Sequence, residues 1–281
     1  MMEVFVIHFF EKLEREINFS KEYDKIEKII CTEYFLLPQG GSGSINTWIE
    51  RNFSKWNKRK AYTSFDEVRE QCGFARPGDL GNMGYLPYVT MENYFLFTEM
   101  LVNLVSDLEE VSYMEKKMSE RYLFVLQTIK ANLEQAGFEI KKTENGYIVV
   151  EKNAVAIEVA SNNPEMADVI IEYNRYLLKG NLTRKREILL KIADALEPKH
   201  EILNQIDKSK TGDYFMMVNN MNVRHNNSDP ASKNYNPAFA ELPDDEKEEW
   251  YDIIYRQGLI LFSLLIYQED KKRIDDFKKH F

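Results

Sequence analysis

Apolar residues recur at helical spacing along almost the whole chain, and this pattern limits the fold more than any other feature. In the first helix that we expect, over residues 2–36, Phe5 and Phe9 begin a series with four-residue steps. Residues 90–136 continue the same texture, with a break near residues 107–116. Side chains at this spacing form one face of an α-helix. The sequence therefore predicts a mainly α protein.

One segment departs from this pattern. In FEIKKTENGYIVVEKNAVAIEVA, Asn145-Gly146 stands between two runs of β-prone residues. An Asn-Gly pair is typical of the tight turn in a β-hairpin. Gly137 is expected to end the helix before the hairpin, and a second turn at Lys152-Asn153 suggests one more short strand. We expect a small β-hairpin insert in an otherwise helical chain.

Four further helices are expected after the hairpin, over about 164–178, 182–206, 211–222 and from Pro243 to 267 or beyond. A chain of 281 residues is long enough for two ordinary domains. We place the division at the hairpin. This gives an N-terminal helical domain over residues 1–136 and a C-terminal domain over residues 137–281, which holds the hairpin and a four-helix bundle.

Composition limits the class of protein. Hydrophobic residues make up 44% of the chain, enough for a sizeable core, and a net charge of −9 argues against coating nucleic acid by bulk attraction. Cys31 and Cys72 show no metal-ligand spacing, which fits a reducing compartment. The apolar residues at the start of the sequence lack the basic region and the cleavage site of a signal peptide. The longest apolar run, GLILFSLLIY, would span only about half of a bilayer. We expect a cytoplasmic protein with no membrane segment.

The stretch NNMNVRHNNSDP, residues 219–230, is rich in amide side chains and holds one of only four histidines. Asn and Ser side chains compete for backbone hydrogen bonds, so they favour helix caps and turns. A helix cap followed by a polar loop therefore explains Asn226 and its neighbours well. It explains the adjacent Arg224 and His225 less well, so we also consider a chemical role.

The chemical interpretation assigns each residue type a task. His225 titrates near neutrality and can move a proton, and Arg224 can bind phosphate without losing its charge. The amides of Asn219, Asn220 and Asn222 can orient a substrate. Such a set suits metal-independent cleavage of RNA, in which a base takes the proton of the 2′-hydroxyl and a cation stabilises the phosphorane. The sequence has no His and Cys spacing typical of zinc, and we expect no metal and no cofactor.

Residues 160–268 resemble the C-terminal region of bacterial abortive-infection proteins, within the wider HEPN-like class of helical bundles. The resemblance is carried by EYNRYLLKGNLTRKREILLKIADALEP, then FMMVNNMNVRHNN, then a long closing helix. Many HEPN proteins are toxin ribonucleases that act as dimers, and related proteins resist phages or form toxin–antitoxin pairs. The resemblance implies a phage-defence or toxin-type ribonuclease that forms a homodimer, with RNA and a cognate antitoxin as partners.

Within this resemblance, His225 takes the place of the family's catalytic His, which acts as acid and base. The family's Arg lies about four to six residues earlier, where this chain has Asn219 and Asn220. Arg224 is therefore assigned to the phosphate, and Asn220 completes the expected catalytic set. The amides expected to help binding are those of Asn219, Asn222 and Asn226.

Two other interpretations stay open, because many HEPN domains have no activity. In the first, the protein is a non-catalytic HEPN-like binding or regulatory protein that docks a partner through the polar Arg-His motif. In the second, the motif is only a structural loop, and the function lies in the N-terminal half.

A basic face is expected on a helix over residues 45–60. Apolar side chains at helical spacing occupy one side of this segment, and the opposite side carries Arg51, Lys55, Lys58 and Arg59. Such a face is either the solvated side of an amphipathic helix or a surface that contacts phosphates. The aromatic residues of the segment do not decide between them, because their spacing assigns them to the core.

Overall fold

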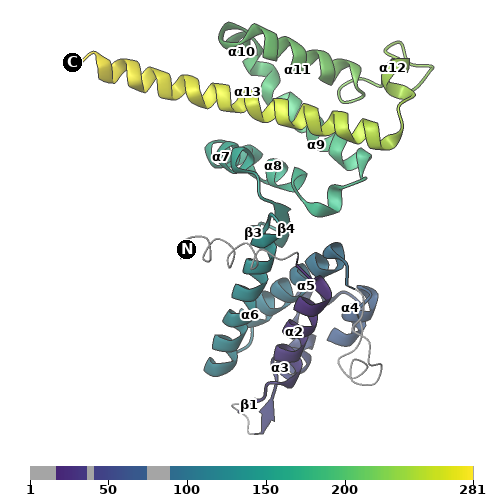
Figure 1. Ribbon diagram of the computed structural model, residues 1–281, viewed down its shortest axis with the longest axis vertical. Helices are drawn as coiled ribbons and strands as arrows, with labels where there is room; N and C mark the ends of the chain where they lie inside the picture. The colour runs from purple at the N-terminus through teal and green to yellow at the C-terminus, as the bar shows by residue number, and fades with distance from the viewer. Residues whose placement is uncertain (1–16, 37–40, 75–88, 281) are drawn as a thin grey trace, which may run out of the picture. The chain divides into compact units, whose positions relative to one another are not determined.

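Figure 1 shows the computed structural model, which describes residues 17–36, 41–74 and 89–280. In this part of the chain, helices dominate and strands form only two sheets of two strands each. The prediction of a mainly α fold with a small β-hairpin is therefore confirmed. The chain packs as two compact units, Met1–Val149 and Val150–Phe281, which are described separately below.

The first unit is built from helices and two short β-pairs. Its helices are α2 (Phe19–Thr32), α3 (Ile45–Asn52), α4 (Phe65–Gln71), α5 (Met91–Glu109) and α6 (Lys116–Gln135). Its strands are β1 (Phe35–Leu36), antiparallel to β2 (Ser42–Gly43), and β3 (Phe138–Thr143), paired with β4 (Gly146–Glu151). Side-chain oxygens of Asn18, Ser44, Ser64, Thr90 and Glu115 accept backbone N–H groups in the first turns of the five helices. Such caps satisfy donors that a helix start leaves unpaired.

The expected first helix over residues 2–36 is described only in part. Within the described residues it begins at Phe19 and ends at Thr32, whereas Phe5 and Phe9 lie outside them. The break between α5 and α6 falls where the sequence predicts it, and Gly137 follows α6 with a φ of +83°.

The helix expected over residues 45–60 is shorter than predicted. It ends at Asn52, and short 3₁₀ turns cover most of residues 53–59. The Asn52 side chain donates to the carbonyl one turn earlier at 2.8 Å, and the Trp56 indole donates to Asp107 Oδ2 at 2.8 Å. These contacts hold the segment in a turning path that a continuous helix would not allow.

The β-hairpin is present as predicted, although Gly146 rather than Asn145 takes the positive φ, of +121°. The hairpin packs against α5. Asn103 donates from Nδ2 to the Tyr147 carbonyl at 2.7 Å and accepts from the Tyr147 N–H at 2.7 Å. Because of these contacts, most of the hairpin belongs to the first compact unit, whereas the expected domain boundary lies before the hairpin, after residue 136.

The core of the first unit is aromatic and encloses one ion pair. The Tyr23 ring stacks on Phe74, with centroids 5.5 Å apart, and meets Phe97 edge-on at 4.8 Å. Arg69, with 0% exposure, pairs with Glu27, with 1% exposure. A buried charge of this kind is tolerated only when it is paired.

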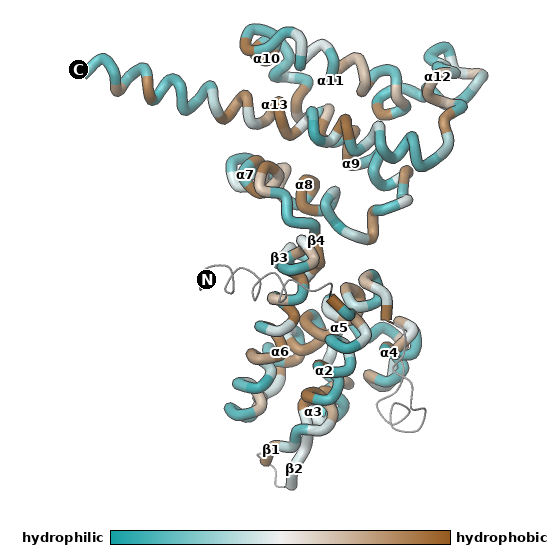
Figure 2. Tube along the Cα trace, viewed as in Figure 1, coloured by the Kyte–Doolittle hydropathy of each residue, from teal (hydrophilic) through white to brown (hydrophobic). Residues whose placement is uncertain are grey.

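In the described part of the second unit, the end of β4 forms an isolated bridge to Arg175, and the remaining residues form helices and loops. These helices are α7 (Ala154–Asn162), α8 (Ala167–Tyr173), α9 (Leu182–Leu196), α10 (His200–Ile206), α11 (Lys208–Asn220), α12 (Pro237–Ala240) and α13 (Asp244–Lys278). Figure 2 shows apolar residues along the part of α13 that faces α9 and α11. Ile254 and Leu261 of α13 are fully buried there, and Trp250, Ile253, Leu264 and Leu265 pack against the same core.

Three predictions for this unit are wrong. The helix expected over about 164–178 is α8, which ends at Tyr173 and is followed by a separate 3₁₀ turn at Tyr176–Leu178. Residues after Lys152-Asn153 form α7 and not a strand, because the Asn153 side chain accepts the Ala156 N–H at 3.0 Å and caps a helix. The helix expected over residues 182–206 is interrupted, because Pro198 lacks a backbone N–H and the chain forms a 3₁₀ turn there. This interruption separates α9 from α10, and its residues Glu197 and Pro198 line the cavity of the candidate site.

Candidate functional site

The polar loop after α11 is held together by its own amides. Asn222 adopts a φ of +57°, which Asn tolerates better than most residues. Asn227 Oδ1 accepts the Asn222 N–H at 2.9 Å, and Asn222 Oδ1 accepts the Asn227 N–H at 3.1 Å. Asn227 also donates to the Asn234 carbonyl at 2.7 Å and is only 2% exposed. These two side chains therefore shape the loop.

The other amides of the loop have smaller structural tasks. Asn220 donates from Nδ2 to the Met216 carbonyl at 2.8 Å, which adds a bond to the last turn of α11. Asn226 is exposed and accepts the Asp229 N–H at 3.3 Å. Asn219 differs, because it lines the cavity described below. Of the four amides assigned to binding or catalysis, Asn219, Asn220, Asn222 and Asn226, only Asn219 lines that cavity.

Arg224 is fixed at the edge of the same cavity. Its backbone N–H donates to the Val218 carbonyl at 3.1 Å, and the preceding Val223 is fully buried. The guanidinium donates from Nη1 to Glu197 Oε2 at 2.6 Å and lies 5.8 Å from the centre of the Phe215 ring. A third contact runs from Nη2 to the Ala193 carbonyl at 3.3 Å. The charged group is thus oriented by α9, the turn after it and α11.

His225 lies elsewhere. Its residue is exposed, and its backbone carbonyl accepts the Asn227 N–H at 3.1 Å. His225 does not line the cavity that Arg224 lines. Of the expected catalytic pair, the structure therefore places only Arg224 at this cavity.

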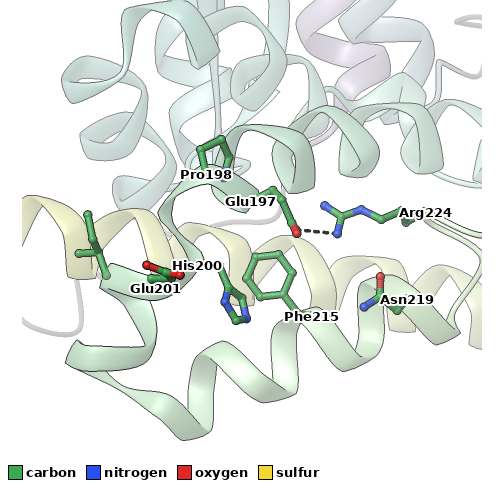
Figure 3. Close-up of a pocket in the computed structure, with 8 residues that line it drawn as sticks. Glu197, Pro198, His200, Glu201, Phe215, Asn219 and Arg224 are labelled. Carbon is green, nitrogen blue, oxygen red and sulfur yellow. Dashed lines mark hydrogen bonds and ion pairs between the residues drawn. The ribbon is translucent and has the colours of Figure 1, made fainter.

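The cavity beside Arg224 measures about 520 Å³ and contains a different histidine (Figure 3). His200 begins α10, and its ring meets the Phe215 ring edge-on at 4.7 Å. The Asn204 amide nitrogen lies 3.2 Å from Nδ1 of His200, within hydrogen-bond distance. In Figure 3 the Phe215 ring lies between the imidazole and the Arg224 guanidinium. The structure thus gathers a histidine, an arginine and an aromatic ring around one open cavity.

Two carboxylates give this cavity an acidic balance. Glu197 and Glu201 both line it, against a single guanidinium. Asp194 lies a further 3.9 Å from Arg224 Nη2. The Glu197 side chain is 54% exposed, so its ion pair with Arg224 contributes about 1 kcal/mol or less. This ion pair therefore orients Arg224, but it adds little free energy to keep the guanidinium there.

His200, Glu197, Glu201 and Phe215 were not expected to form a site. Their chemistry becomes visible only when α10 folds back beside α11, because His200 and Arg224 are far apart in sequence. The signal that points to this arrangement is Pro198, which interrupts a helical pattern two residues before the pair His200-Glu201.

The expected basic face of residues 45–60 is distributed over several environments. Lys58 Nζ lies 3.0 Å from Asp107, and Lys55 donates at 2.9 Å to a hydroxyl in the loop between α5 and α6. Arg59 donates to a backbone carbonyl at 3.0 Å, and Arg51 is exposed. Lys55 and Lys58 also line a second cavity, of about 280 Å³, in which carboxylates are as numerous as lysines. Lys55, Lys58 and Arg59 therefore have different partners, and two of these cations, Lys55 and Lys58, line the same cavity.

Comparison with known proteins adds no relative. No model of a protein family matches the chain, and no curated protein or solved structure gives a significant match. Among the described residues, no three His, Cys, Asp or Glu side chains are grouped so that they could hold a metal ion. None of the described helices combines the length and apolar character needed to cross a membrane.

Proposed function

We propose that this protein is a non-catalytic HEPN-like binding protein, and that the cavity beside Arg224 docks a basic segment of a protein partner. One observation carries the proposal. The chain's own guanidinium already lies over Phe215 and pairs with Glu197, while Glu201 lines the same cavity. The cavity therefore offers a second carboxylate for a second cation.

The lining suits an arginine or lysine side chain along its whole length. Pro198 and Ile202 supply apolar surface for the alkyl stem. Phe215 and the His200 ring supply aromatic surface near the charged end. A volume of about 520 Å³ is large enough for such a side chain beside Arg224.

The charge of the whole chain supports the same class of partner. A net charge of −9 attracts basic proteins and repels polyanions over long range. In the setting implied by the HEPN-like resemblance, the partner is a cognate antitoxin or another defence protein. The binding would be sensitive to salt, since its contacts are ionic and partly exposed.

A charge-reversal experiment tests the proposal. A fluorescein-labelled hexa-arginine peptide is titrated with the full chain, and anisotropy gives its Kd. Glu201→Lys should weaken binding by about fivefold to tenfold, because it replaces an attraction in the cavity by a repulsion. Glu165→Lys, an exposed change in the same unit with the same effect on net charge, serves as the control. Equal effects of both variants would show that the cavity is not the binding site.

A second candidate, metal-independent RNA cleavage, is favoured by the shared cavity of His200 and Arg224. His200 would take the 2′-hydroxyl proton, the 2′-oxygen would attack phosphorus to form a 2′,3′-cyclic phosphate, and the 5′-oxygen would leave with a proton taken from water. Arg224 would have to exchange Glu197 for the phosphate. This exchange, next to two carboxylates, makes the candidate the weaker of the two.

RNA cleavage is tested with a single-stranded oligonucleotide in EDTA. The binding proposal expects no cleavage by the wild type. Cleavage lost in His200→Ala but kept in His225→Ala would favour the cavity described above as a nuclease site. Cleavage lost only in His225→Ala would support the expectation from the sequence. Measurement of the mass in solution would test the expected homodimer.

A further inference from the structure

A smaller cavity in the first unit has an apolar interior. It measures about 160 Å³ and lies among α5, α6 and the β-hairpin. Its apolar wall comes from Val102, Leu126, Ile129 and Ile140. A dry apolar cavity of similar volume, about 150 Å³, is known to bind benzene in an engineered protein. The size therefore matches a ligand with one aromatic ring.

Polar side chains also line this cavity, namely those of Ser106, Glu109, Tyr122, Lys130 and Tyr147. The Tyr122 side chain lines it, and the residue is 4% exposed. Its hydroxyl has no hydrogen-bond partner among the described residues. Burial raises the pKa of this hydroxyl, and the charges of Glu109 and Tyr147 raise it further. Both of these residues also line the cavity, so the three polar groups lie close to one another.

A buried hydroxyl without a partner requires an explanation, because nearly all such groups in proteins are hydrogen-bonded. A water could pair with the hydroxyl, but it would leave the apolar wall of Val102, Leu126, Ile129 and Ile140 without a matching surface. A ligand that places its own hydroxyl beside Tyr122 would satisfy the group. That hydroxyl could accept from Tyr122 and donate to the carboxylate of Glu109. Tyr122 and Tyr147 would at the same time offer aromatic surface to a ring.

We propose that this cavity is a binding site for a small single-ring aromatic molecule that carries a hydroxyl group. The site is independent of the cavity beside Arg224, because every residue that lines it belongs to the first unit. Recognition has two parts: the ring fills the apolar interior, and the hydroxyl pairs with Tyr122 and Glu109.

Phenol and toluene are matched probes for the two parts. Each is titrated into the full chain, and ligand-observed NMR gives the Kd. Phenol should bind saturably and at least fivefold more tightly than toluene, because toluene cannot pair with Tyr122. Tyr122→Phe should weaken phenol binding about fivefold and leave toluene binding unchanged.

Two further variants serve as controls. Tyr214→Phe removes another fully buried hydroxyl without a partner, in the second unit, and should leave phenol binding as in the wild type. Leu126→Phe adds volume at a half-buried position of the wall and should abolish binding of both probes. Circular dichroism establishes that each variant is folded. The proposal is overturned if phenol does not bind saturably, if Tyr122→Phe binds it as well as the wild type, or if Tyr214→Phe weakens it equally.

Discussion

Asn227→Ala provides a quantitative test of the structural role of the polar stretch. The Asn227 side chain accepts the Asn222 N–H at 2.9 Å and donates to the Asn234 carbonyl at 2.7 Å, and the residue is 2% exposed. Alanine cannot make either bond, and both backbone groups would lose a partner in a place that water reaches poorly. Each buried group left unpaired costs about 1–3 kcal/mol, so for two groups we expect a loss of about 2–6 kcal/mol.

Urea unfolding followed by circular dichroism measures this loss in the transition of the second unit. Asn226→Ala is the matched control, because Asn226 lies one residue away, is exposed, and makes one longer bond at 3.3 Å. The control should change the free energy of unfolding by about 0.5 kcal/mol or less. If Asn227→Ala loses less than about 1 kcal/mol, or no more than Asn226→Ala, the loop is not held as described.

Three further predictions concern the first unit. Gly146→Ala should destabilise the first unit by about 2 kcal/mol or more in a thermal melt. The φ of Gly146 is +121°, and a Cβ there would collide with the Asn103 side chain. An unchanged Tm would refute the hairpin geometry. Burial raises the pKa of Cys31 to about 12, so the thiolate population grows only as pH rises toward that value; DTNB should label Cys31 slowly at pH 8, and rapid labelling would contradict its burial. Arg69→Leu should lower the free energy of unfolding in urea by about 3–5 kcal/mol, because it leaves the buried carboxylate of Glu27 without a partner. The double variant with Glu27→Gln should recover part of this loss. A larger loss in the double variant would contradict the pairing.

Local chemistry explains what the sequence predicts correctly. The hairpin follows from Asn145-Gly146 between β-prone runs, and Gly137 ends α6 because a positive φ suits glycine. Both features depend on a few neighbouring residues. Local sequence leads to the wrong prediction at Asn153, where it indicates a turn before a strand. An Asn side chain can favour a turn or cap a helix, and here it caps α7, which buries Val159 and Ala160.

The candidate site could not be predicted in the same way. The expected pair, Arg224 and His225, are neighbours in sequence, but only Arg224 lines the cavity, and His225 is exposed. The pair that shares a cavity, His200 and Arg224, is brought together by the interruption at Pro198 and by the packing of α10 on α11. Such packing is a tertiary property, and spacing along the chain does not report it.

An NMR experiment on the histidine rings tests the binding proposal most directly. The chain has four histidines, so variants at His200 and His225 are enough to assign the two imidazole signals of interest. Addition of hexa-arginine peptide should shift the His200 signal saturably and leave the His225 signal in place. A His225 signal that moves while His200 stays unchanged would contradict docking in the cavity beside Arg224.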